Sequence, residues 1–126
     1  MLTGIAMIAV GIALGAFGAH GLKQVVSDPD KLVSFETGVR YQLTHGLAFL
    51  ALAALSSKFS EVGMRIFRFL LIGVILFSGS IYGLVLSSIG GDNLLIKFFG
   101  PITPIGGLLL IVGWSLLFVQ VWKSKR

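Results

Sequence analysis

A polar segment inside an otherwise apolar sequence organises this chain, and it runs Ser34-Phe35-Glu36-Thr37-Gly38-Val39-Arg40-Tyr41-Gln42-Leu43-Thr44-His45-Gly46-Leu47-Ala48. At about 100° per residue, one face of a helix through this segment carries polar side chains, with Arg40 and His45 at its borders. The polar side chains on that face are Ser34, Thr37, Tyr41 and Thr44. Lipid offers no hydrogen bonds, so such a face in a membrane chain is predicted to point inward, toward other helices or water.

The composition around this segment is that of a membrane protein. The 126 residues have a mean hydropathy of +0.98 and only 12% charged side chains, whereas a soluble domain carries about a quarter. No charged side chain falls within residues 1–22, 41–57, 69–91 or 98–122. Apolar runs of about 18 residues or more are typical of transmembrane helices. The run at 41–57 reaches this length only if its helix begins upstream, among the charges.

We therefore predict an all-α integral membrane protein, a bundle of four transmembrane helices that forms one membrane domain over residues 1–126. The predicted spans cover about residues 2–22, 34–57, 64–89 and 102–122. Ser27-Asp28-Pro29-Asp30 combines a capping side chain with a proline in the first turn, the pattern of a helix start. The helix of the second span is thus expected to begin at the membrane interface, over about residues 29–36.

Small residues line the first predicted span along two stripes. One stripe consists of glycines, Gly4, Gly11, Gly15 and Gly18. The opposite stripe is Ala6, Ala9, Ala13, Ala16 and His20. Small side chains let helix backbones approach closely in lipid. We predict that the first span packs against other helices on both sides.

The basic residues predict the orientation of the bundle. The net charge is +5, but the cations stand singly or in short groups at the ends of apolar runs, which argues against a nucleic-acid partner. With four spans, one side of the membrane receives Lys58, Arg65, Arg68, Lys123, Lys125 and Arg126. The other receives Lys23, Lys31 and Lys97, with Arg40 at the edge of its helix. The positive-inside rule then places both termini in the cytoplasm.

Polar groups within the predicted spans are candidates for a ligand pocket, because burying them in lipid is expensive. The candidate residues are His20, Glu36, Thr37, Arg40, Tyr41, Thr44, His45, Ser78, Ser80, Tyr82 and Thr103. Most of them fall in the outer half of the membrane. A cluster confined to half the depth favours a closed pocket or a hydrogen-bonded contact between helices over a pore.

Alternatives remain open at the ionisable candidates. Glu36 and Arg40 have the spacing and order of a helical ion pair, although Arg40 could instead hold an anion or a lipid phosphate. His45 either bridges helices through hydrogen bonds or takes part in proton relay or ligand binding. A metal site is not expected, since the chain has two histidines and no cysteine, and no carboxylate stands at a ligand spacing beside either histidine. No cofactor is expected.

Several segments together resemble the YgdD-like family of small bacterial membrane proteins. They are Gly15-Ala16-Phe17-Gly18-Ala19-His20-Gly21-Leu22, the segment from Thr37 to Ala48, Phe77-Ser78-Gly79-Ser80-Ile81-Tyr82, and Thr103-Pro104-Ile105-Gly106-Gly107 followed by Gly113-Trp114. The resemblance covers essentially the whole chain. It implies a four-span inner-membrane protein that is a domain of unknown function, and it supplies no reaction.

Two hypotheses for function follow. The first is a non-enzymatic membrane protein that acts in membrane or envelope homeostasis, with membrane lipids as partners and a lipid or small apolar molecule as ligand. The second is a minimal transporter or channel, a homo-oligomer that conducts protons or a small solute along the polar face of the second span. An enzyme is not expected, because the chain shows no nucleophile–base set and no metal cage.

Overall fold

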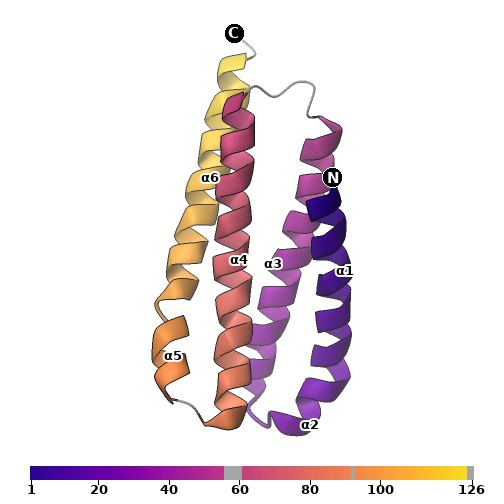
Figure 1. Cartoon of the computed structure of the whole chain (residues 1–126), viewed down its shortest axis with the longest axis vertical. Coiled ribbons are helices and arrows are strands. Elements are labelled where there is room, and N and C mark those ends of the chain that lie inside the picture. Colours follow the sequence, from indigo (N-terminus) through magenta and orange to yellow (C-terminus); the bar gives the residue numbers. More distant parts are fainter. Residues whose placement is uncertain (56–60, 92, 125–126) are drawn as a thin grey trace.

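The structure is a computed structural model that describes residues 1–55, 61–91 and 93–124. Throughout these residues the chain is helical apart from short connections, which confirms the all-α class (Figure 1). The first helical segment is α1 (Leu2–Phe17), followed by a π-helix (Gly18–Leu22) and the short α2 (Lys23–Val25). The remaining elements are α3 (Pro29–Ala54), α4 (Glu61–Gly90), α5 (Asn93–Phe99) and α6 (Ile102–Ser124).

The long helices stand side by side in the order in which they occur along the chain (Figure 1). α1 packs on α3, α3 packs on α4, and α4 packs on α6. α1 and α6 lie at opposite sides of the bundle, and the two chain termini are found toward the same end (Figure 1). The bundle is therefore an open row in which α3 and α4 each pack extensively on two long helices.

Three helical segments are long and apolar enough to cross a membrane by length and composition: Leu2–Val25, Gly63–Gly90 and Leu94–Ser124. These three correspond to the first, third and fourth predicted spans. α3 is not among them because charged and polar residues, Glu36 and Arg40 among them, occupy its first half. The predicted count of four spans is therefore not confirmed and stays a prediction.

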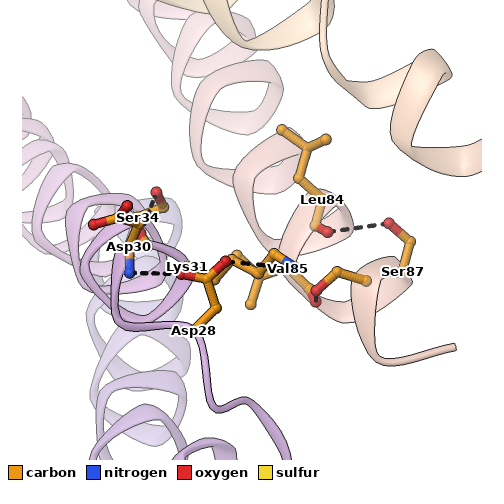
Figure 2. Close-up of polar contacts among 8 residues, drawn as sticks. Asp28, Asp30, Lys31, Ser34, Leu84, Val85 and Ser87 are labelled. Carbon is orange, nitrogen blue, oxygen red and sulfur yellow. Dashed lines mark hydrogen bonds and ion pairs between the residues drawn. The ribbon is translucent and has the colours of Figure 1, made fainter. Parts of the chain in front are cut away.

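The predicted helix start before the second span is confirmed. α3 begins at Pro29, and the Asp28 side chain accepts a hydrogen bond from the Asp30 backbone amide at 3.0 Å (Figure 2). The Lys31 ammonium approaches the other Asp28 oxygen at 3.8 Å. A capping side chain of this kind stabilises a helix by about 1 kcal/mol. At the far end of α4, Gly91 has φ +68°, a conformation that favours glycine and ends the helix.

The glycine stripe of the first span packs against α3, as predicted. A methyl group on Gly4 would lie 2.8 Å from the Gly46 carbonyl oxygen, and one on Gly18 would lie 3.0 Å from the Phe35 ring. A methyl group on Gly4 would press on the backbone of α3, and one on Gly18 would require the Phe35 ring to shift, so both contacts favour glycine. The prediction for the alanine stripe is wrong, because its members are all exposed: Ala6, Ala9, Ala13, Ala16 and His20. α1 stands at the end of the row, so it has one long-helix neighbour rather than two.

A second glycine contact joins α4 to α6. A methyl group on Gly106 would lie 2.8 Å from the Cα atom of Phe77, so the two backbones touch directly. Gly73 and Gly113 fit beneath leucines of the facing helix in the same interface. Backbones that approach this closely gain van der Waals contact. In lipid this contact stabilises helix packing, because the hydrophobic effect does not drive helices together there.

Two apolar clusters fill the interior at different heights. One, which includes Phe49 and Leu70, lies toward the end that holds the termini. The other, which includes Phe35 and Val85, lies toward the opposite end. Along α3 and α4 the buried polar side chains fall between these clusters: Gln42, His45, Ser78 and Ser80. The candidate site is this polar layer.

We predict that Gly106→Ala destabilises the bundle by about 2 kcal/mol, because the added methyl forces the α4 and α6 backbones apart. Gly79→Ala is the matched control, since a methyl group there meets nothing within 4 Å. The control should be neutral or slightly stabilising, as alanine has the higher helix propensity. Thermal unfolding in detergent measures both variants. Equal unfolding temperatures would contradict the assigned α4–α6 contact.

Candidate functional site

Gln42 is the centre of the polar layer and joins three helices. Its side chain is only 8% exposed. The Nε2 atom donates to the Met7 carbonyl of α1 at 2.9 Å, and the Oε1 atom accepts from the Tyr82 hydroxyl of α4 at 2.9 Å. An amide offers both a donor and an acceptor, so this one side chain links α1, α3 and α4.

Gln42 was missing from the candidate residues, although a signal for it exists in the sequence. Buried positions of α3 follow one another at alternating intervals of four and three residues: Phe35, Val39, Gln42, Gly46 and Phe49. Gln42 is the polar member of this otherwise apolar series. A polar residue within an apolar stripe of this spacing specifies how helices align.

A second bond between α3 and α4 lies one helical turn away. The buried Ser78 hydroxyl donates to the Gly38 carbonyl at 2.9 Å. The Tyr82 ring also covers Gly38, where a methyl group would lie 2.8 Å from its Cε1 atom. The missing side chain at Gly38 therefore lets both residues of α4 reach the backbone and side chains of α3.

His45 connects α3 to α6. Trp114 Nε1 donates to His45 Nε2 at 3.1 Å, and His45 Nδ1 lies 2.8 Å from the Tyr41 carbonyl oxygen. An indole N–H only donates, so Nε2 acts as the acceptor and the proton of the neutral ring is assigned to Nδ1. Both nitrogens are thereby used inside the protein. This geometry favours the helix-bridging role of His45 over proton relay, because protonation of Nε2 would break the bond to Trp114.

Ser80 and Thr103 form the remaining polar bridge between α4 and α6. Their hydroxyl oxygens are 2.7 Å apart, and Ser80 also donates to the Phe77 carbonyl at 3.0 Å. Tyr41 stands beside this bridge with its ring centroid 4.5 Å from that of Phe77. Its side chain is 41% exposed, so it covers the polar layer from outside rather than lying within it.

The other candidates lie outside the layer. His20 is exposed in the π-helix that follows α1, with Nδ1 3.3 Å from the Ala16 carbonyl oxygen. Glu36, Arg40 and Thr44 are exposed on α3, and Thr37 is half-buried.

The inward direction predicted for the hydroxyl-rich face is therefore wrong at Ser34 and Thr44. Their hydroxyls, like that of Thr37, donate to the carbonyl four residues earlier. A serine or threonine that bonds to its own helix needs no partner on another helix, so this face can point away from the bundle. The buried face of α3 is the neighbouring one, which carries Gln42 and His45.

The predicted ion pair between Glu36 and Arg40 is also not formed. Within residues 1–55, 61–91 and 93–124, the ion pair present is Lys31–Asp28. Exposed pairs contribute little to stability, so nothing compels these two side chains to meet. In the same described part of the chain, no three histidine, aspartate or glutamate side chains gather in a way that could hold a metal ion.

An apolar groove of about 370 Å³ opens beside Gln42, between α1 and α4. Met7, Val10 and Leu14 of α1 form one wall, and Val74 and Ile75 of α4 form the other. The polar side chains along it already have partners within the protein: Gln42, Ser78 and Tyr82. A second groove, of about 410 Å³ and between α3 and α4, is lined in part by Thr37 and Thr103.

We predict that His45 and Trp114 are coupled in a double-mutant cycle of His45→Phe and Trp114→Phe. Each single change leaves the ring nitrogen of the other residue without its hydrogen bond, so the two should show a coupling of about 1 kcal/mol in the free energy of unfolding. Thr44→Val combined with Trp114→Phe is the control, because the Thr44 hydroxyl bonds to the Arg40 carbonyl of its own helix. A coupling near zero for His45 and Trp114 would refute the bridge.

Residues 14–107 match the family described as "Protein of unknown function (DUF423)". A UPF0382 membrane protein of Staphylococcus aureus is 44% identical over 122 residues, covering 94% of this chain and 88% of the relative. One from Schizosaccharomyces pombe is 39% identical over 120 residues, covering 94% and 93%. UPF0382 membrane protein YwdK of Bacillus subtilis is 38% identical over 121 residues, covering 94% and 89%. No solved structure matches. With this coverage and identity, the chain belongs to the DUF423 family, whose members carry the name of UPF0382 membrane proteins.

Proposed function

We propose that this chain is a non-enzymatic membrane protein that holds a lipid acyl chain, or a similarly thin apolar ligand, in the groove between α1 and α4. The observation that carries the proposal is the groove itself, with its apolar walls and a volume of about 370 Å³. Ligand sites are concave, mostly apolar and about 300–1,000 Å³ in size. Such a protein would act in membrane or envelope homeostasis.

The open row of helices supports this proposal. α1 and α4 both pack on α3, so the space between them opens to the outside rather than being filled by a further helix. At the base of the groove, the Tyr82 hydroxyl donates its proton to Gln42 Oε1, which leaves fewer hydrogen-bonding positions for water there. An acyl chain suits such a surface because it needs no hydrogen bonds.

A conducting path has less support from the same observations. Conduction requires polar groups that stay available to ions or water along the pore. The side chains of the polar layer instead bond to other parts of the protein, and the Tyr82 hydroxyl beside it bonds to Gln42. The segment Leu2–Leu22, which forms α1 and the π-helix, contains no charged side chain. The proposal of a homo-oligomeric transporter is therefore second to that of a ligand-binding protein.

We further propose that α3 is a fourth span, with both termini in the cytoplasm of a bacterial cell and the bundle in its inner membrane. Two observations support this topology. α3 packs between α1 and α4 along its length, from the contact of Phe35 with Gly18 to that of Gly46 with Gly4. The exposed cations Arg65, Arg68 and Lys123 also lie toward the end that holds both termini.

The topology can be tested with single cysteines, because the natural sequence has none. Ser27→Cys lies before α3 and Ser124→Cys lies at the end of α6, and both positions are exposed. Four spans place them on opposite sides of the membrane, whereas a bundle in which α3 does not cross places them on the same side. We expect an impermeant maleimide to label Ser27→Cys in spheroplasts and Ser124→Cys only in inverted vesicles. Labelling of both in spheroplasts would refute the fourth span.

Ligand binding can be tested by filling the groove. Gly79 lines it and is exposed, so Gly79→Leu should block the groove without disturbing helix contacts. In bilayers that contain a lipid with a photoreactive acyl chain, we expect crosslinks to concentrate at Val10 and Ile75, the exposed residues of the two groove walls, and to fall at least about fivefold in Gly79→Leu. Ala13→Leu, on the exposed alanine stripe, is the control and should leave them unchanged. An even distribution of crosslinks that Gly79→Leu does not alter would overturn the proposal.

A further inference from the structure

A separate groove of about 510 Å³ lies between α4 and α6, at the end of the bundle that holds both termini. Its apolar lining includes Ile66 and Phe69 from α4 and Leu116 and Val119 from α6. Arg65 and Lys123 also line it. This groove is distinct from the one beside Gln42, and it differs from that groove by having two cations.

The cations stand at the outer end of this groove. Arg65 lies in the second turn of α4, which begins at Glu61, and Lys123 lies in the last turn of α6, which ends at Ser124. At about 1.5 Å per residue, Leu116 is roughly 10 Å deeper along α6 than Lys123. The groove therefore has a positively charged mouth and an apolar interior, along an axis parallel to the helices.

Both cations are available to a ligand. Arg65 and Lys123 are exposed, and among the side chains that the structure describes no carboxylate forms an ion pair with either. Arg68, also exposed, adds to the positive charge at this end. Arginine binds phosphate through paired N–H groups, and lysine adds a compact charge beside it. Basic pockets between membrane helices are where anionic lipid headgroups bind.

We propose that this groove binds an anionic phospholipid. The phosphate lies between the Arg65 guanidinium and the Lys123 ammonium, and one acyl chain runs inward along Phe69, Leu116 and Val119. A free phosphate ion would use only the mouth of the groove. The apolar interior favours the attached acyl chain, which is why the ligand is a lipid. The site does not depend on the proposed function of the other groove.

The experiment compares two lipids in bilayer nanodiscs, phosphatidylglycerol and phosphatidylcholine, and counts the lipids retained on the protein by native mass spectrometry. Each basic residue near the surface contributes about fivefold to anionic-lipid binding, so we expect a preference for phosphatidylglycerol of about 20-fold. Arg65→Gln with Lys123→Gln should reduce this preference to about onefold to twofold. Lys23→Gln with Lys97→Gln removes the same charge at the opposite end and should preserve the preference.

Two further variants and a soluble competitor separate the contribution of the cations from that of the acyl chain. Val119→Trp fills the apolar interior and should lower retention of phosphatidylglycerol while leaving both cations in place. Soluble glycerol phosphate should fail to displace the bound lipid. Lys123→Gln alone, an exposed change in the last turn of α6, keeps the test valid if the double variant does not fold, and it should lower the preference about fivefold. An absent preference in the natural protein, or equal losses in the two double variants, would overturn the proposal.

Discussion

The arrangement of the helices depends on one buried amide that must bond in two directions. Gln42 donates to the α1 backbone at Met7 and accepts from Tyr82 of α4. Glycine contacts bring the helices close in lipid, but they carry no hydrogen bond between side chains. A shift of one turn would leave an end of the Gln42 side chain unbonded, at a cost of about 1–3 kcal/mol. The amide therefore fixes the heights of α1 and α4 relative to α3.

The polar layer and the glycine contacts depend on each other. Ser78 reaches a backbone carbonyl of α3 because Gly38 has no side chain in the way. On the far side of α4, the direct contact of Gly106 with the Phe77 backbone brings Thr103 within 2.7 Å of Ser80. Short hydroxyl side chains can bridge helices only where the backbones are close. Small residues thus determine where hydroxyl side chains can form hydrogen bonds between helices. Those hydrogen bonds in turn hold the small residues in contact.

The sequence predicted where helices begin and which glycines form contacts better than it predicted which face of each helix is buried. The α3 start at Asp28 and Pro29 and the packing of Gly4 and Gly18 follow from local chemistry and spacing, and both are confirmed. The inward face of α3 could not be deduced from polarity alone, because Thr44 satisfies its hydroxyl on its own helix whereas Gln42 cannot. Nor does a stripe of alanines reveal whether a neighbour exists. That depends on the place of α1 in the row, which is a property of the whole chain.

The order of the helices has a consequence for how the protein is made. Each long helix packs on the next one along the chain, so a membrane-inserted chain can assemble in the order of its synthesis, without waiting for distant segments. α1 and α3 form the first hairpin, in which the Gln42 Nε2 atom already finds Met7. Its Oε1 atom gains its partner only when α4, which carries Tyr82, packs on the hairpin. The unpaired Oε1 atom thus favours packing of the newly made α4 at the one height at which Tyr82 can donate to it.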